Sequence, residues 1–371
     1  MMNSRDLVRG LVDRSRFDRV AAADNFWPET LDAWVAQGYP TRTVIEDGAE
    51  AIKPEDPQQH LDLDLWRCGS AVNRYPILGF EQVLEESDEW ILKRDGAGAA
   101  FKTWKRKFGT PEHVDFFMKS REIWDRDYRP HLLSMDPRRI EPKKDREALQ
   151  RVHGAGKASC ISHIFIFEVM RQSMGDFTMY ENVILDPGWV RDFNRVYTDF
   201  YIAHHRALYA EAGAPDLVQI SEDLGYRDRL FISPTMLEDM FLPYYIEMVR
   251  FHHAHGVRVI FHSCGKTTEA LPLILATGSD VLNPMEVKAG NDLFGFARAH
   301  GDRLAFKGGL DVRVLETGDR DLIRREVIRV VEGMKALGAR YIFGSDHSVT
   351  PRVSYDSYRC ALDAYREHMM Y

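Results

Sequence analysis

The sequence predicts a TIM-type (β/α)8 barrel with an irregular N-terminal extension that carries a β-hairpin. Two observations favour this α/β fold. From about residue 158 short apolar runs alternate with helical patterns, and several of the helices end in glycine before the next run. An open doubly wound sheet is the competing architecture, but no Gly-rich phosphate loop follows an early strand. The 371 residues, 44% of them apolar, suffice for one barrel.

The chain divides near residue 150 into an N-terminal segment, 1–150, and a barrel body, 151–371, which we expect to form one structural domain. Residues 82–105 alternate weakly in hydropathy and contain the turn signal Asp95-Gly96. We therefore expect a small antiparallel β element there, then a helical link to about residue 150. The first parts of the barrel should also come from the N-terminal segment.

The expected barrel strands are 160–166, 216–221, 258–263, 281–285, 304–309 and 341–345, with 20–26 as a candidate seventh. Two helix starts are marked by Asp186-Pro187 and Ser233-Pro234, where a capping side chain precedes proline at the first helical position. An eighth strand is needed to close the barrel, and the sequence pattern does not assign it.

Composition excludes several classes of function. The net charge of −8, from 49 basic and 57 acidic residues, argues against nucleic-acid binding. We expect no membrane span, because no run of 18 or more apolar residues occurs, and no secretory signal. Four scattered cysteines are better interpreted as reduced thiols than as disulfides, which favours a cytoplasmic location.

The strongest chemical signal follows the expected strand 258–263. His262 and Cys264 are separated by one position, so both point the same way from a strand, and imidazole with thiolate suits zinc. Because a parallel barrel carries its chemistry at the C-terminal ends of its strands, we predict a metal site at the barrel mouth. The alternative is a buried cysteine beside a hydrogen-bonded histidine.

Polar residues after two other strands are further candidates. Asp346 and His347 follow 341–345, and either could complete a three-ligand site; the alternative is a polar loop before the last helix. Glu222 and Asp223 follow 216–221, and only one should face the mouth, because adjacent strand residues face opposite sides. Glu222 could be a ligand, a base or an orienting group, with Asp223 capping a helix.

Other histidines lie outside these strand ends. His163 interrupts an apolar run and could reach the mouth, as could Ser162. Five histidines on expected helices are predicted to be solvated or interface groups: His204, His205, His252, His253 and His255.

Residues 150–371 resemble the uroporphyrinogen decarboxylase superfamily. The motifs that carry the resemblance are Gln219 through Gly225, Ile232-Ser233-Pro234, Leu242-Pro243-Tyr244-Tyr245, Phe261 through Gly265, Asn283-Pro284, Lys307 through Asp311, and Gly344 through Pro351. Their order and spacing over some 200 residues are far more specific than any one motif. The resemblance implies a TIM-type barrel.

One branch of this superfamily decarboxylates a tetrapyrrole without metal, and the other comprises zinc-dependent methyltransferases that use a corrinoid protein. His262-x-Cys264-Gly265 resembles the methyltransferase branch, which implies His262 and Cys264 as two zinc ligands. The place of that branch's third ligand, a cysteine, is held here by His347, four positions before Pro351. The arginine-rich N-terminal loop of the tetrapyrrole decarboxylases is missing, which argues against that substrate.

The leading hypothesis is therefore zinc-dependent methyl transfer between a corrinoid on a partner protein and a thiol or other small heteroatom substrate. The resemblance implies Zn²⁺ on His262, Cys264 and His347, with Glu222 handling a proton and Asp346 orienting His347. A separate corrinoid protein is implied because the chain has no Asp-x-His-x-x-Gly pattern. A homodimer is a further family-based expectation.

Two other hypotheses stay open. One is a metal-independent decarboxylase or lyase of a small acidic substrate, with Arg227, Arg229, Lys288 or Lys307 binding carboxylates. The other is a non-enzymatic corrinoid- or tetrapyrrole-binding protein.

Overall fold

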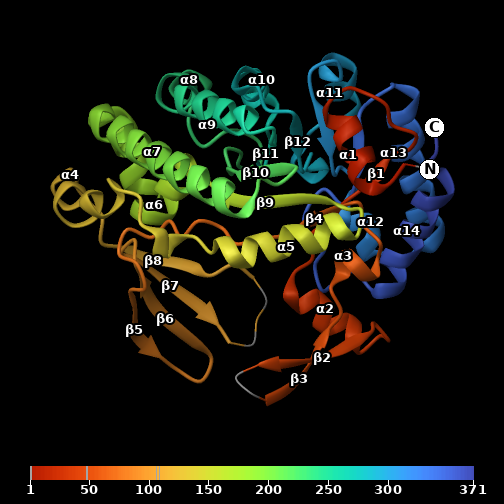
Figure 1. Cartoon of the computed structure of the whole chain (residues 1–371), viewed down its shortest axis with the longest axis horizontal. Helices are drawn as coiled ribbons and strands as arrows, with labels where there is room; N and C mark the ends of the chain where they lie inside the picture. The colour runs from red at the N-terminus through yellow and green to blue at the C-terminus, as the bar shows by residue number, and fades with distance from the viewer. Residues whose placement is uncertain (1, 47–48, 106, 108) are drawn as a thin grey trace.

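A nearly closed barrel of eight parallel strands forms the centre of the molecule (Figure 1). The computed structural model describes residues 2–46, 49–105, 107 and 109–371. The strand order is β1-β14-β13-β12-β11-β10-β9-β4, and its neighbours run parallel. The strands are β1 Ala21–Ala22, β4 Leu65–Arg67, β9 Ala158–Ile164, β10 Leu217–Ser221, β11 Arg258–His262, β12 Val281–Asn283, β13 Ala305–Lys307 and β14 Tyr341–Phe343. The predicted TIM-type barrel is confirmed.

The barrel closes at the seam, the place where β1 and β4 meet, and one buried carboxylate joins the two sides of this seam. The Asp64 N–H donates to the Ala22 carbonyl at 2.8 Å. The buried Asp64 side chain accepts from the Ala22 N–H at 2.8 Å and from both terminal nitrogens of Arg19 at 2.7 and 2.6 Å. Segment 20–26 thus supplies a strand as predicted, whereas β4 is the strand that the sequence pattern left unassigned.

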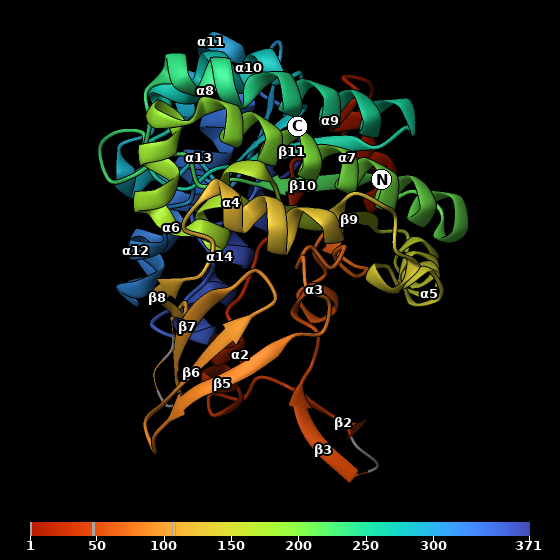
Figure 2. The same cartoon turned by 90° about the vertical axis from the view of Figure 1, so that its left-hand side faces the viewer.

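The N-terminal extension holds two antiparallel sheets, which project from one side of the barrel (Figures 1 and 2). One is the hairpin β2 Thr41–Glu46 with β3 Ala49–Pro54. The other has four strands, β5 Glu81–Glu86, β6 Trp90–Asp95, β7 Ala99–Trp104 and β8 Glu112–Phe116. The predicted turn lies between β6 and β7, where the Asp95 carboxylate accepts from the N–H groups of Ala97 and Ala99 at 2.9 and 3.1 Å. The sheet is larger than the predicted hairpin.

Helices surround the barrel, and several begin where the capping residues predict. Asp186 accepts from the Trp189 N–H at 3.0 Å, and Ser233 accepts from the Met236 N–H at 3.3 Å. The α-helices are α1 Ser4–Val12, α2 Pro28–Val35, α3 Pro57–His60, α4 Arg121–Ile123, α5 Pro142–Gly154, α6 Ile166–Leu185, α7 Pro187–Ala212, α8 Pro234–Met240, α9 Leu242–Ala254, α10 Leu271–Thr277, α11 Leu293–His300, α12 Val312–Glu316, α13 Arg320–Ala336 and α14 Tyr355–His368. Shorter turns of helix are η1 Trp124–Tyr128, η2 Arg129–Leu132, η3 Pro137–Arg139, η4 Thr268–Ala270 and η5 Val287–Ala289.

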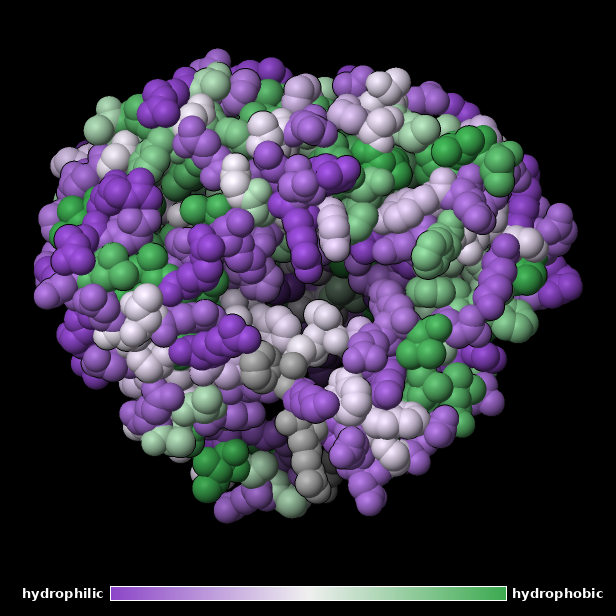
Figure 3. Space-filling view, turned by 180° about the vertical axis from the view of Figure 1, so that it is seen from behind, coloured by the Kyte–Doolittle hydropathy of each residue, from purple (hydrophilic) through white to green (hydrophobic). Residues whose placement is uncertain are grey.

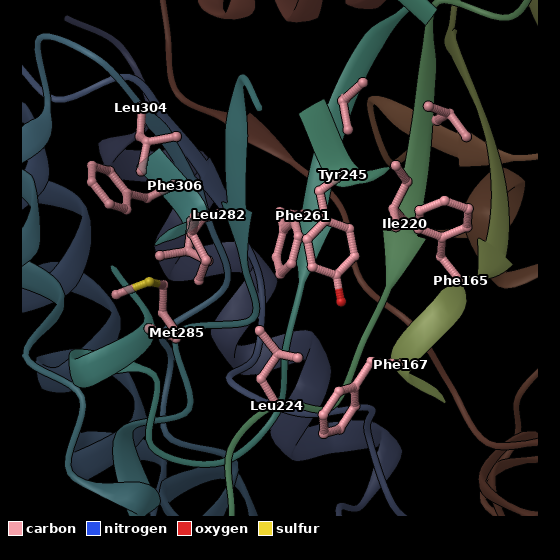
Figure 4. Packing of buried hydrophobic residues seen from close by; sticks show 14 of the residues in the cluster. Phe165, Phe167, Ile220, Leu224, Tyr245, Phe261, Leu282, Met285, Leu304 and Phe306 are labelled. Carbon is pink, nitrogen blue, oxygen red and sulfur yellow. The ribbon is translucent and has the colours of Figure 1, made fainter. Parts of the chain in front are cut away.

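Strand residues alternate between two apolar layers. An inner layer fills the barrel, and its members are Leu65, Cys160, Leu217, Ile260, Val281, Ala305 and Ile342. An outer layer packs the strands against the helices, and Figure 4 shows Ile220 and Phe261 of this layer beside Tyr245 from α9. The Tyr245 and Phe261 rings meet edge to face with centroids 5.4 Å apart. This alternation decides which polar side chains enter the barrel mouth.

The surface around the barrel is largely hydrophilic, and the face seen in Figure 3 is hollowed near its centre. Within the described ranges, we find no helix with the length and apolarity needed to cross a membrane.

Candidate metal centre

Three side chains converge where β10 and β11 end. His262 is the last residue of β11, Cys264 lies two positions later, and Asp223 follows β10. Their ligand atoms all lie within 4.8 Å of one another. The Cys264 Sγ lies 3.4 Å from His262 Nε2, and an Asp223 oxygen lies 3.7 Å from the same nitrogen. That Asp223 oxygen also accepts from the Cys264 N–H at 3.1 Å, so the loop backbone positions it.

Asn283 fixes the protonation of the His262 ring. The Asn283 side-chain nitrogen donates to the Lys307 carbonyl at 3.2 Å, so its oxygen must face His262. This oxygen lies 2.6 Å from His262 Nδ1 and can only accept, which places the proton on Nδ1. Nε2 therefore presents its lone pair toward Cys264 and Asp223, as a metal-binding imidazole must.

The pKa shifts of His262 and Cys264 favour a bound cation at this centre. Desolvation lowers the pKa of His262 and outweighs the Asp223 carboxylate and the Asn283 hydrogen bond, which raise it, so the ring is neutral near pH 7. Desolvation also raises the pKa of the Cys264 thiol well above its usual range, and the carboxylates of Asp223 and Glu286 add to this. A thiolate here needs a positive partner. A nitrogen, sulfur and oxygen donor set of this kind fits zinc.

The loop after His262 passes so close to the loop at Gly225 that only glycine fits at position 265. At Gly265, with φ of 76°, a Cβ would lie 2.4 Å from the carbonyl carbon of Gly225. The Gly265 N–H donates to a Glu286 carboxylate oxygen at 2.6 Å, and the other Glu286 oxygen pairs with Lys288 at 3.3 Å. Glycine thus lets two loops touch, and this contact holds Cys264 over the barrel mouth.

Glu222, the residue expected at the mouth, faces the helix layer instead. Its fully buried carboxylate accepts from the N–H groups of Phe167 and Glu168 at 3.1 and 2.7 Å, so it caps the first turn of α6. Burial raises the pKa of Glu222 to about 8, against the lowering effect of those two N–H groups. Only one of the two acids faces the mouth, as expected, but it is Asp223.

Asp346 and His347 lie on the neighbouring loop and have different surroundings. The buried Asp346 carboxylate accepts from the backbone N–H groups of Val287, Lys288 and Val312 at 3.0, 3.4 and 2.9 Å. It ties three loops together and makes no hydrogen bond to the His347 ring. His347 Nδ1 lies 3.3 Å from the Ser348 carbonyl, and His347 is not part of the group of three ligand atoms that the described residues form here.

Two cavities flank the centre. His262 lines one of about 390 Å³ inside the mouth, together with Arg67, Arg74, Gln219 and Ser221. Asp223 lines a larger one, of about 670 Å³, between α6 and the four-stranded sheet. Arg74 and Gln172 meet between the cavities through a 2.6 Å hydrogen bond.

The two arginines of the smaller cavity escaped the sequence prediction. Arg67 ends β4 and Arg74 follows it, and β4 itself was unassigned. The available signal was the short apolar pair Leu65-Trp66 followed by a cation. Of the cations named instead, Arg229 pairs with Asp228 at 3.1 Å. Lys307 is buried, and its burial lowers the pKa of its ammonium group against the raising effect of the Asp24 carboxylate.

The five helical histidines were expected to be solvated or interface groups, and three of them are not solvated. His204, His205 and His252 are 0%, 1% and 0% exposed, because α7 and α9 turn these faces toward the barrel. His163 faces outward from β9 and packs in the same layer between the strands and the helices. Its ring stacks on the ring of Tyr201, with the centroids 4.7 Å apart.

A family model named uroporphyrinogen decarboxylase (URO-D) matches residues 168–368, more than half of the chain. The chain belongs to the uroporphyrinogen decarboxylase family. The matched region covers β10 through β14 and all of the candidate metal ligands. No curated protein sequence matches the chain.

Solved structures resemble the fold of this family member. A methyltransferase from Methanosarcina mazei is 13% identical with a TM-score of 0.66, and the match covers 99% of both chains. A D-psicose 3-epimerase from Clostridium cellulolyticum H10, determined with D-tagatose, is 13% identical with a TM-score of 0.41, covering 68% of this chain and 96% of that one. The first match supports the barrel fold over the whole chain.

Proposed function

We propose that the chain is a zinc-dependent methyltransferase that moves a methyl group between a corrinoid on a partner protein and a small thiol or other heteroatom substrate. The observation that carries the proposal is the convergence of His262, Cys264 and Asp223 between two cavities. Fold similarity along the whole chain to a structure described as a methyltransferase supports it.

His262, Cys264 and Asp223 are the residues that would hold zinc. His347, the third ligand that the resemblance implies, is proposed to approach the ion from the neighbouring loop without filling the fourth position, which stays open for the substrate. Bound zinc would lower the pKa of a substrate thiol and favour its nucleophilic thiolate form.

The other residues around the centre would position the zinc ligands or bind the substrate. Asn283 keeps the His262 lone pair directed at the centre, and the loop contact through Gly265 keeps Cys264 in place. Arg67 and Arg74 would bind an anionic group of the small substrate in the smaller cavity. The larger cavity, beside Asp223, is the side where the corrinoid partner would dock. Glu222 and Asp346 are assigned as positioning residues that anchor α6 and the loops.

Elemental analysis of untagged protein purified without added metal tests the site. Cys264→Ala and Asp223→Asn should each contain one zinc per chain fewer than wild type, and His347→Ala should bind that zinc more weakly. Cys68→Ala, which removes a partly buried thiol outside the group, should keep the wild-type content. Demethylation of methylcobalamin with a thiol acceptor, followed by visible absorption, should be lost in Cys264→Ala.

A folded wild-type protein that binds no zinc even when zinc is supplied would sink this mechanism. The runner-up is then a metal-independent decarboxylase or lyase, and Arg67 and Arg74 in one cavity with His262 favour it, because two guanidinium groups suit an acidic substrate. Carbon dioxide release that persists after chelation would distinguish it.

A further inference from the structure

A second group of histidines lies outside the barrel mouth. His163 comes from β9, His205 from α7 and His252 from α9, and one ring nitrogen of each lies within 4.8 Å of the other two. The three side chains belong to residues that are 5%, 1% and 0% exposed. The ring centroids of His163 and His205 are 4.9 Å apart, and those of His205 and His252 are 5.3 Å apart.

Hydrogen bonds orient the three rings in one way. His163 Nδ1 lies 2.9 Å from the Ile164 carbonyl, and His205 Nδ1 lies 3.0 Å from the Tyr201 carbonyl. A carbonyl only accepts, so both rings carry their proton on Nδ1 and leave a lone pair on Nε2. His252 Nδ1 is held by the Tyr209 hydroxyl at 3.1 Å.

The opposite nitrogens are buried without partners. None of the three Nε2 atoms makes a hydrogen bond to any residue that the structure describes. At least two of them, on His163 and His205, are acceptors, because those rings carry their proton on Nδ1. An unpaired buried acceptor costs about 1–3 kcal/mol, so two beside a third unpartnered nitrogen call for an occupant. Burial also lowers the pKa of His163 to about 4 and lowers the pKa values of the other two, which keeps the rings neutral, the form that binds metal.

We propose that His163, His205 and His252 form a second metal site, a buried tri-imidazole site for a divalent transition-metal ion. Three imidazoles suit Zn²⁺, and their Nδ1 partners supply the orienting contacts that such ligands need. His163 and Tyr201 also line the 390 Å³ cavity at the mouth, so one side of the site lies next to that cavity. The site joins one barrel strand to two helices.

The test uses zinc alone as the probe and a protein without the first centre. After loading and removal of excess zinc, the His262→Ala/Cys264→Ala double variant should retain one zinc per chain. X-ray absorption should show nitrogen or oxygen ligands at about 2.0 Å and no sulfur at about 2.3 Å. Adding His205→Phe should abolish this zinc.

His204→Phe is the matched control, because His204 is equally buried and adjacent on α7, but its Nε2 already accepts from the Asp136 N–H at 3.1 Å. It should keep the zinc. Thermal unfolding adds a second readout: zinc should raise the Tm of the double variant, and this zinc-dependent rise should be absent once His205→Phe is added.

A folded double variant without zinc, or zinc retained by His205→Phe, would overturn the second site, and neither result bears on the first centre. Should the double variant not fold, a cobalt titration of the wild-type protein decides. The first equivalent of cobalt, at the Cys264 centre, should give a thiolate-to-cobalt band in the near ultraviolet. A second equivalent of cobalt should add visible bands without increasing the absorbance of the near-ultraviolet band. Absence of the second equivalent would overturn the proposal.

Discussion

At the scale of single residues, Asn283 shows how a side chain that touches no substrate can decide the chemistry of a centre. It accepts the His262 proton with one end and is itself oriented by the Lys307 carbonyl at the other. Without it, the His262 ring could place its proton on the nitrogen that faces Cys264. Such outer contacts are typically worth about 10- to 100-fold in metal affinity.

We therefore expect Asn283→Ala to weaken zinc binding at the first centre by about 10- to 100-fold. Asn283→Asp should retain most of the affinity, because a carboxylate accepts the same proton. Competition with a chromophoric zinc chelator measures both. Equal affinities of wild type and Asn283→Ala would show that Asn283 does not control the ring.

The sequence predicts that His262 and Cys264 lie together, because they are separated by one position at the end of a strand and a glycine follows. The choice between Glu222 and Asp223 needed the register of the sheet. Ser221 pairs with the inward-facing His262, so Glu222 is outward and Asp223 inward again. The buried His205 had a detectable signal, since it continues the four-residue spacing of the buried Tyr197 and Tyr201 on α7.

At the scale of elements, the kink of α6 couples this helix to the four-stranded sheet. Gly175 interrupts the helix with φ of 78°, and a Cβ there would lie 2.5 Å from the ring of Phe116 on β8. The first turns of α6 carry Glu168, Arg171 and Gln172, which line the larger cavity. The kink thus lets the sheet pack close enough to wall that cavity.

Gly175→Ala should destabilise the protein by about 1–3 kcal/mol, since it adds a strained backbone and a clash with an aromatic ring. Gly154→Ala is the control, because its Cβ would meet nothing within 4 Å at the end of α5. The control should be neutral or slightly stabilising. Urea unfolding compares the two, and equal midpoints would contradict this account of the kink.

The elements that escaped prediction are those with a weak hydropathy pattern. β4 has three residues, too few to show a period. β8 lies outside the segment 82–105 for which a β element was predicted, and four of its five residues are exposed because the four-stranded sheet projects from the barrel, so no apolar alternation marks it. The long strand–helix repeats of the barrel body were predictable because each strand is buried on both faces.

At the scale of the whole molecule, the barrel depends on its seam. Asp64 gathers Arg19, the Ala22 N–H and the Ser4 hydroxyl in a buried network between β1 and β4. Removing one partner of such a pair leaves a buried charge without compensation.

Asp64→Asn should therefore lower the free energy of unfolding by about 3–5 kcal/mol. Asp115→Asn removes an ion pair with Lys119 in which both side chains are more than half exposed, so it should change stability by no more than about 1 kcal/mol. Urea denaturation measures both variants. A seam variant as stable as the control would mean that the strand hydrogen bonds alone close the barrel.

The pairing of Ala21 with Ile342 has a consequence for synthesis on the ribosome. β1 emerges early, yet its partner β14 is among the last elements to be translated, so the ring of strands cannot close during most of elongation. Until then the early strand exposes an unpaired edge, a condition that invites wrong pairing. Because β1 is short, with only two paired residues, the exposed edge stays small until β14 has been translated.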